Sequence, residues 1–145
     1  MRFELRAVEG EHEYPRLLAV WRSSVEATHD FLTPADIEFF AARVPAYFPG
    51  VDLTAAVVDG VVAGFSGVAG GELAMLFVHA AHRGEGIGSA LLRKAFAEFP
   101  RLTVDVNEQN AQAVGFYLHH GFVVVGRSEL DSEGRPFPLL HLKRA

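Results

Sequence analysis

Hydrophobic and polar positions follow two periods along the chain, and these periods separate predicted strands from predicted helices. Residues 2–8 alternate with the period of a strand. Between residues 11 and 28, Leu17, Trp21 and Val25 recur on one stripe, as on a helix that covers a core. The chain is therefore predicted to begin with a strand followed by an amphipathic helix.

A second helix is predicted to begin after Thr33. Threonine is a good N-cap, and Pro34 then occupies the first helical position, where a missing N–H group costs nothing. Pro45 and Pro49 are expected to break this helical region.

The rest of the chain reads as strands interrupted by two helices. Asp59-Gly60 and Gly70-Gly71 are typical of hairpin turns between strands. Gly121 is expected to end the last helix. The predicted elements are two or three strands over 53–78, a helix to about residue 99, a strand over 101–106, a helix over 110–121, and a closing hairpin over 122–144. This order predicts an α/β fold with a mixed sheet, parallel where helices cross over and antiparallel at the hairpins.

Composition narrows the function classes. Thirteen Lys and Arg against 18 Asp and Glu give a formal charge of −5, which disfavours a general nucleic-acid binder. The absence of cysteine excludes disulfides, cysteine-based zinc sites and a thiol nucleophile. No apolar run has the length of a membrane span, and residues 1–10 lack the apolar region of a signal peptide, so we expect a cytoplasmic protein without a membrane partner.

Three glycines at alternate positions, Gly84, Gly86 and Gly88, stand where a strand gives way to a helix, with Arg83 just before them. Free N–H groups at a helix start, together with glycines that let a ligand approach the backbone, form a phosphate cradle. A tight strand-to-helix turn without a ligand is the alternative. The dinucleotide fingerprint fails because Ser89 stands where its last glycine belongs, and no Gly-Lys pair exists for a P-loop.

The motif that fits is R-x-x-G-x-G, from Arg83 to Gly88, and it is similar to the acetyl-CoA pyrophosphate loop of the GNAT acetyltransferase superfamily. A second segment, "NAQAVGFYLHHGF" from Asn110 to Phe122, resembles the family pattern N-x-x-A-x-x-F-Y-x-x-x-G-F. The segments "ATHDFL", "VNEQNAQAVGFY" and "GRSELDSEGRPFPLL" resemble its small bacterial YjaB-type branch. The resemblance implies a single GNAT domain over residues 1–145, with about seven strands and about four helices.

The resemblance also implies an acyl-CoA-dependent N-acetyltransferase that passes the acetyl group of acetyl-CoA directly to an amine. In the family pattern, the amides of residues 83–89 hold the pyrophosphate, and the strand end at 76–78 pairs with the pantetheine arm, which enters where this strand splays from the next. The expected cofactor-binding residues are Leu76, Phe77, Val78, Arg83, Gly84, Glu85, Gly86, Ile87, Gly88, Ser89, Asn107, Asn110, Phe116 and Tyr117.

Four residues are candidates for proton transfer. The resemblance implies that Tyr117 protonates or stabilises the departing thiolate, since a phenol remains a donor at neutral pH. Glu72 resembles the glutamate base of histone-type members by its spacing to Arg83, while Glu26 and His29 lie where the family builds its acceptor wall. Structural roles are the alternatives: Tyr117 as an aromatic residue of the core, Glu72 as an exposed acid, and His29 as a helix cap. The resemblance also allows a mechanism without a single basic residue, in which a chain of water molecules removes the proton from the amine.

The acceptor is not specified by the sequence; it is an amine of a small molecule, or a lysine or N-terminus of a protein. No metal is expected, and the chain is a monomer or a homodimer. A regulatory acetyl-CoA sensor with little turnover is the alternative function, and a different nucleotide-binding domain is a third possibility.

The charged segment 126–140 is interpreted as a solvated hairpin tip.

Overall fold

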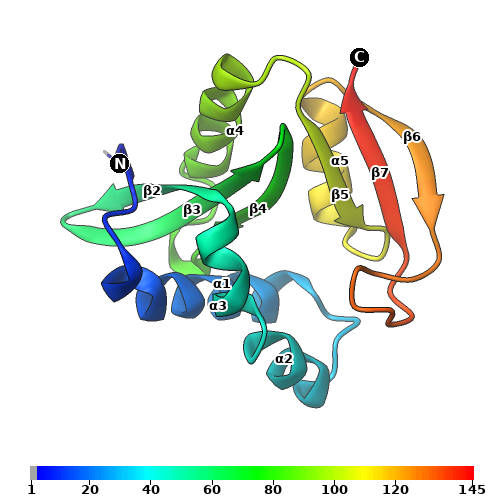
Figure 1. The fold of residues 1–145 in the computed structure, drawn as a ribbon, viewed down its shortest axis with the longest axis horizontal. Helices are drawn as coiled ribbons and strands as arrows, with labels where there is room; N and C mark the ends of the chain where they lie inside the picture. Colours follow the sequence, from blue (N-terminus) through cyan, green and yellow to red (C-terminus); the bar gives the residue numbers. More distant parts are fainter. Residues whose placement is uncertain (1–2) are drawn as a thin grey trace.

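Seven strands form one mixed sheet in the computed structural model, which describes residues 3–145 (Figure 1). Their order in space is β1-β2-β3-β4-β5-β7-β6, and every neighbouring pair is antiparallel except β4 with β5. This confirms the predicted mixed α/β sheet. The strands are β1 (Glu4–Ala7), β2 (Asp52–Val58), β3 (Val61–Ala69), β4 (Glu72–Val78), β5 (Thr103–Asn107), β6 (Phe122–Ser128) and β7 (Leu139–Arg144).

Helices cover both faces of the sheet. The helix α1 packs on β3 and β4, α4 packs on β2 to β4, and α5 packs on β5 and β6. Thr33 caps α2 as predicted, because its hydroxyl accepts from the Asp36 N–H while the Asp36 carboxylate accepts from the Thr33 N–H. The helices are α1 (Tyr14–Thr28), α2 (Pro34–Ala41), the single turn α3 (Val44–Tyr47), α4 (Ile87–Glu98) and α5 (Ala111–His119), with 3-10 turns at Glu11–Glu13, Phe48–Gly50 and Ala80–His82.

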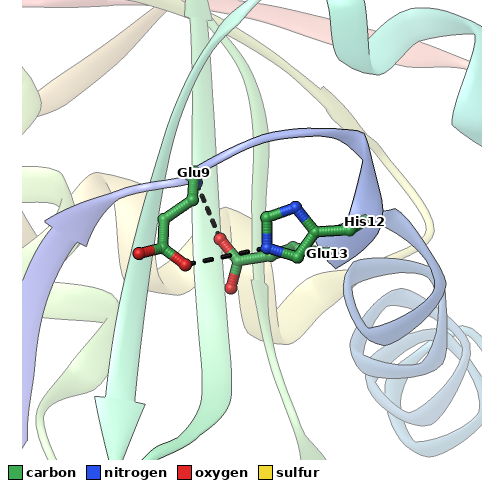
Figure 2. Close-up of side chains that lie close together, drawn as sticks. All are labelled: Glu9, His12 and Glu13. Carbon is green, nitrogen blue, oxygen red and sulfur yellow. Dashed lines mark hydrogen bonds and ion pairs between the residues drawn. The ribbon is translucent and has the colours of Figure 1, made fainter.

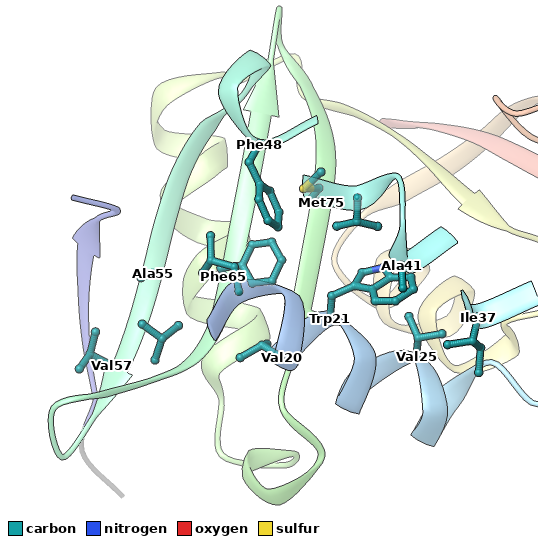
Figure 3. Packing of buried hydrophobic residues seen from close by; sticks show 13 residues of the cluster. Val20, Trp21, Val25, Ile37, Ala41, Phe48, Ala55, Val57, Phe65 and Met75 are labelled. Carbon is teal, nitrogen blue, oxygen red and sulfur yellow. The ribbon is translucent and has the colours of Figure 1, made fainter. Parts of the chain in front are cut away.

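Successive side chains of β2 point alternately to the two faces of the sheet and contribute to a different part of the core on each face. Ala55 and Val57 belong to a cluster with α1, α2 and α3, whereas Ala56 and Val58 pack with α4 on the other side. Figure 3 shows the first cluster, in which the rings of Phe48 and Phe65 lie 5.9 Å apart between the sheet and the helices. Burial on both faces fixes the register of β2, because a slip of one residue would exchange the two sets of side chains.

The sheet opens between β4 and β5. These two strands pair only at Glu72↔Thr103 and Leu73↔Val104, so the rest of β4 has no partner on that side. The register between β3 and β4 jumps at Ala74, which is a bulge at the point where β4 leaves β5. A bulge bends a strand, so it accounts for the splay that the family resemblance implied.

The loop between β6 and β7 is packed against the helices, which corrects its interpretation as a solvated tip. Arg135 forms an ion pair with Asp36 at 2.5 Å and lies over the ring of Phe39 at 4.1 Å. Glu133 accepts a hydrogen bond from Tyr47. These contacts join segments up to 99 residues apart in the sequence, so local charge patterning gave no sign of them.

Candidate functional site

A cavity of about 460 Å³ lies in the opening between β4 and β5. It brings together every predicted cofactor-binding residue except Glu85, whose carboxylate instead contacts His82 at 2.8 Å. His29, the C-cap residue of α1, also lines it. Residues absent from our sequence expectation complete the wall: Ser24, Thr28, Leu73, Ala74, His82, Val104, Asp105, Val106, Gln112 and Ala113.

The glycine loop presents free backbone N–H groups at one end of this cavity. Gly84 and Gly86 have φ angles of 79° and 85°, a left-handed conformation that glycine adopts without strain. Gly86 is the N-cap of α4, and the first backbone bond of this helix runs from the Ala90 N–H to the Gly86 carbonyl. The N–H groups before Ala90 are therefore available to an anion, and the helix dipole adds partial positive charge there.

His120 supports the start of α4 from α5, and the sequence analysis missed it. Its Nδ1 lies 2.8 Å from the Phe116 carbonyl, so it must donate there, and its Nε2 lies 3.2 Å from the Ser89 hydroxyl. The imidazole also packs on the Phe116 ring, with centroids 4.4 Å apart. Because Ser89 and His120 are 31 residues apart, no local motif could reveal this contact.

Tyr117 and Asn110 meet the cavity from α5. Asn110 is the N-cap of this helix, and its Oδ1 accepts from the Ala113 N–H at 3.2 Å, which leaves its amide NH₂ group for a ligand. Tyr117 is 6% exposed, and no hydrogen bond from its hydroxyl is found within residues 3–145. Burial raises the pKa of Tyr117 well above its ordinary value, so the phenol keeps its proton throughout the neutral range.

A second cavity of about 590 Å³ adjoins the first. The two share the residues His29, Leu73, Ala74, Phe77, Asp105 and Asn107, so they are two halves of one cleft. Trp21, Phe31, Phe40 and Phe137 give the second half aromatic walls, and Glu72, Asp105 and Asp131 place carboxylates in it. Such a chamber suits an apolar stem that carries a positive charge.

The structure separates the carboxylate candidates Glu72 and Glu26. Glu72 lines the second cavity, and burial, reinforced by the nearby Asp105 charge, raises its pKa. Glu26 is exposed and lines neither cavity. Since Val25 points into the core and consecutive helical residues are rotated by about 100°, Glu26 faces away from the cleft. This corrects the expectation that Glu26 belongs to the site.

His29 stands at the junction of the two cavities in a defined tautomer. The Thr28 hydroxyl donates to the Ser24 carbonyl at 2.8 Å, so it must accept from His29 Nδ1, also at 2.8 Å. The Nε2 of the neutral ring is then an acceptor. Burial, offset in part by the Asp30 charge, lowers the pKa of His29 to about 4. Because this pKa lies far below that of an alkyl ammonium, the ring is poorly suited to deprotonate an amine, whereas Nε2 can accept a hydrogen bond from one.

The partly buried His29 also makes the stability of the fold depend on pH. Its pKa is about 4 in the folded chain and about 6.5 in an unfolded one, so the unfolded state binds more protons between these values. The free energy of unfolding should therefore fall as pH drops through this window. Urea unfolding should show wild type losing about 2 to 3 kcal/mol more than His29→Gln between pH 7 and pH 4.5. His12→Gln, at an exposed position, is the control; equal pH dependence of wild type and His29→Gln would contradict the prediction.

Glu9, His12 and Glu13 gather before α1, in an arrangement that resembles a metal site (Figure 2). Glu13 already accepts two hydrogen bonds from Arg6, at 2.7 and 2.9 Å, and one from the Glu9 N–H at 2.7 Å. The Arg6 contact is the main reason why the pKa of Glu13 is lowered to about 2. The group lines neither cavity and ties β1 to the start of α1.

Among residues 3–145, the structure contains no helix with the length and apolar character needed to cross a bilayer.

Comparisons with known proteins agree with this geometry. The sequence model of the family described as "Acetyltransferase (GNAT) domain" matches residues 50–124. The chain is 46% identical to the peptidyl-lysine N-acetyltransferase YjaB of Salmonella typhimurium, covering 94% of this chain and 92% of that one. It is 43% identical to YjaB of Escherichia coli K12, covering 94% and 91%.

Solved structures give the same result. The solution structure of apo YjaB from Escherichia coli superposes with a TM-score of 0.91 and 40% identity, covering 100% of this chain and 99% of that one. The PaiA N-acetyltransferase of Thermoplasma acidophilum, solved with coenzyme A, shares the fold, with a TM-score of 0.78 and 20% identity over the full length of both chains. The chain therefore belongs to the GNAT family, and it is an N-acetyltransferase that transfers the acetyl group of acetyl-CoA to an amine.

Proposed function

We propose that the acceptor of this N-acetyltransferase is the ε-amine of a lysine in a peptide or protein. The observation that carries the proposal is the second half of the cleft, where aromatic walls lead to the carboxylates of Glu72 and Asp105. A lysine side chain offers a matching four-carbon stem and a terminal ammonium. Both YjaB relatives carry the name peptidyl-lysine N-acetyltransferase, which supports the same acceptor.

The first half of the cleft is proposed to hold acetyl-CoA. The N–H groups around Gly86 and Ser89, with the Arg83 guanidinium, would hold the pyrophosphate by charge-assisted hydrogen bonds. The free side of β4 at residues 76–78 would pair with the amides of the pantetheine arm. The NH₂ groups of Asn107 and Asn110 lie on the opposite wall, where they would bind the arm near the thioester.

Each proton in the transfer is assigned to a residue. The neutral amine nitrogen attacks the thioester carbonyl, and a strand N–H near Phe77 or Val78 donates to the oxygen as negative charge develops. The C–S bond then breaks, and Tyr117 gives its hydroxyl proton to the departing sulfur. The attacking nitrogen loses its extra proton as the amide forms, and this proton passes through water to the Tyr117 oxygen and restores the hydroxyl. The chain has no cysteine, so an acetyl-thiol intermediate on the enzyme is excluded, which supports direct attack.

A peptide assay tests the acceptor. Wild-type protein is incubated with acetyl-CoA, a lysine peptide and the same peptide with norleucine in place of lysine, and acetylation is located by mass spectrometry. Both peptides have a blocked N-terminus, so that lysine offers the only amine. We expect one acetyl group on the lysine ε-nitrogen and none on the norleucine peptide. Acetylation of free α-amines or small amines alone would contradict the lysine acceptor.

The same assay addresses the sensor alternative. Tight coenzyme A binding, without turnover on any amine of a broad panel, would support a regulatory module. The cytoplasmic location and the choice between monomer and homodimer stay predictions.

A further inference from the structure

Two hydrogen bonds fix the His120 imidazole behind the first turn of α4. Its Nδ1 lies 2.8 Å from the Phe116 carbonyl oxygen, and its Nε2 lies 3.2 Å from the Ser89 hydroxyl. Ser89 lines the first cavity and His120 does not, so the hydroxyl joins the imidazole to the cavity wall. The role proposed above for Ser89 concerns its backbone N–H group, and neither side chain has a part in it.

The chemistry of the groups fixes the direction of both hydrogen bonds. A carbonyl oxygen only accepts, so His120 Nδ1 carries a hydrogen and donates it to Phe116. In a neutral imidazole the other nitrogen then has a lone pair and no hydrogen, so Nε2 accepts from the Ser89 hydroxyl. The single hydrogen of that hydroxyl therefore points to His120, and the Ser89 oxygen has only lone pairs to offer a ligand.

This arrangement opposes an anion at the start of α4. The backbone N–H groups of Gly88 and Ser89 precede the first backbone hydrogen bond of the helix and attract a phosphate oxygen. A phosphate oxygen that reached Ser89 Oγ would meet lone pairs, because the hydroxyl hydrogen is engaged by His120. With a neutral imidazole, the side chain of Ser89 thus works against the backbone beside it.

Protonation of His120 removes this conflict. Both nitrogens of an imidazolium donate, so Nε2–H would donate to Ser89 Oγ while Nδ1–H keeps its bond to Phe116. The Ser89 hydroxyl would then turn its hydrogen to a phosphate oxygen, and the positive ring would add to the attraction for the anion. Histidine is the side chain that ordinarily gains or loses its charge between pH 5 and pH 8.

We propose that His120 is a positioning residue for Ser89 and that binding of the coenzyme A diphosphate is coupled to protonation of His120 at Nε2. The proton comes from solvent and forms an N–H bond with the Nε2 lone pair, and no covalent bond of the ligand changes. Affinity should rise as pH falls through the neutral range, because the bound state holds more protons than the free state. The inference rests on the proposed placement of the pyrophosphate at the start of α4.

Basic side chains occupy the elements around this ring. His119 precedes His120 on α5, is exposed, and has its ring centroid 5.3 Å from that of His120. Arg93 follows Ser89 by one turn of α4, and Arg144 on β7 lies over the Phe96 ring at 4.2 Å. None of these three is an acid, so the diphosphate would bring the negative charge with which an imidazolium pairs.

A second histidine at the first cavity competes for the same role. His82 lines this cavity, and its Nδ1 donates to the Glu85 carboxylate at 2.8 Å. Its Nε2 would gain a hydrogen if this ring, rather than His120, became charged beside the phosphates. The test therefore replaces His82 and His120 separately.

Isothermal calorimetry with 3′-dephospho-coenzyme A measures the coupling. This ligand keeps the diphosphate and lacks the phosphomonoester, whose second pKa of about 6 would add to the proton count. Titrations in buffers with different enthalpies of ionisation give the number of protons taken up per ligand bound. For wild type we expect about 0.3 to 0.5 proton at pH 7, and an affinity about fivefold to tenfold higher at pH 6 than at pH 8.5.

His120→Gln places near Ser89 a neutral amide that can donate at every pH. We expect it to take up less than about 0.1 proton and to change its affinity less than about twofold between pH 6 and pH 8.5. Ser89→Ala removes the hydroxyl and should lose at least half of the uptake, since only the charge of the ring still acts on the anion. His119→Gln, at an exposed position that lines neither cavity, is the matched control and should keep the wild-type coupling.

Three results would overturn the proposal. They are binding by wild type without proton uptake, uptake that persists in His120→Gln, and uptake that disappears in His82→Gln but not in His120→Gln. Each of them leaves the diphosphate at α4, because Gly88→Val tests that placement separately. No binding of dephospho-coenzyme A or coenzyme A by wild type would contradict the proposed cofactor site and the coupling together.

Discussion

Replacing Tyr117 by phenylalanine is expected to lower kcat by about 100-fold to 10,000-fold, the range of general acid catalysis. The substitution removes only the hydroxyl group of a residue that lines the first cavity, and this hydroxyl has no hydrogen bond within residues 3–145. Without it, α5 offers no acidic proton to the thiolate, because the other side chains of this helix that line the cavity are those of Gln112, Ala113 and Phe116. Steady-state release of the coenzyme A thiol at saturating substrates measures the effect.

Binding and stability should hardly change in Tyr117→Phe. The ring packs at 5.3 Å from Phe116 and 5.4 Å from Phe122, and phenylalanine keeps both contacts. Tyr14→Phe is the matched control, since Tyr14 stacks on Phe48 at 4.9 Å and lines neither cavity. A kcat within threefold of wild type would show that another group, or solvent, protonates the thiolate.

Gly88→Val is expected to abolish coenzyme A binding, with a loss of at least about 100-fold in affinity, or about 2.7 kcal/mol. Unlike Gly84 and Gly86, Gly88 has no positive φ, so the substitution does not strain the backbone. A Cβ atom there would meet only Phe116 at 3.6 Å and Val78 at 3.9 Å, which is ordinary contact in the free protein. Both neighbours line the cofactor cavity, so the valine would occupy space proposed for the ligand.

The folded protein should tolerate this change, because glycine is a poorer helix former than valine. Gly115→Val is the matched control: Gly115 lies in α5, is exposed, and has nothing within 4 Å of the corresponding position. Isothermal calorimetry with coenzyme A and thermal unfolding of both variants separate binding from stability. Normal affinity in Gly88→Val would show that the phosphate does not approach α4 here.

Local signals in the sequence were sufficient for most of the fold. The stripe of α1, the Thr33 cap, the paired turns at Asp59-Gly60 and Gly70-Gly71, and the glycine loop each depend on neighbours a few residues away. Hydrophobic periodicity and turn chemistry act at this range. The predicted lining residues of the first cavity followed from the same signals, because they belong to two continuous segments, residues 76–89 and 107–117.

The second cavity, which is proposed to hold the acceptor, could not be predicted from local sequence motifs. Glu26 and His29 are three residues apart, yet the turn of α1 puts only His29 at the junction of the cavities. The loop around Arg135 closes on α2 through a pair 99 residues apart. His120 meets Ser89, and Ser128, His141 and Asp105 meet one another, only because α5 packs beside α4 and the strands order as β5-β7-β6.

The sequence by itself determined the elements, the mixed sheet and the glycine loop before α4, because hydrophobic period, capping and glycine conformation are properties of neighbouring residues. Tertiary structure alone decided where β4 leaves β5, how deeply Tyr117 and His29 are buried, and which carboxylates line the second cavity. Those features depend on strand order, on a bulge at Ala74 and on desolvation, and each arises from contacts between segments that are distant in the chain.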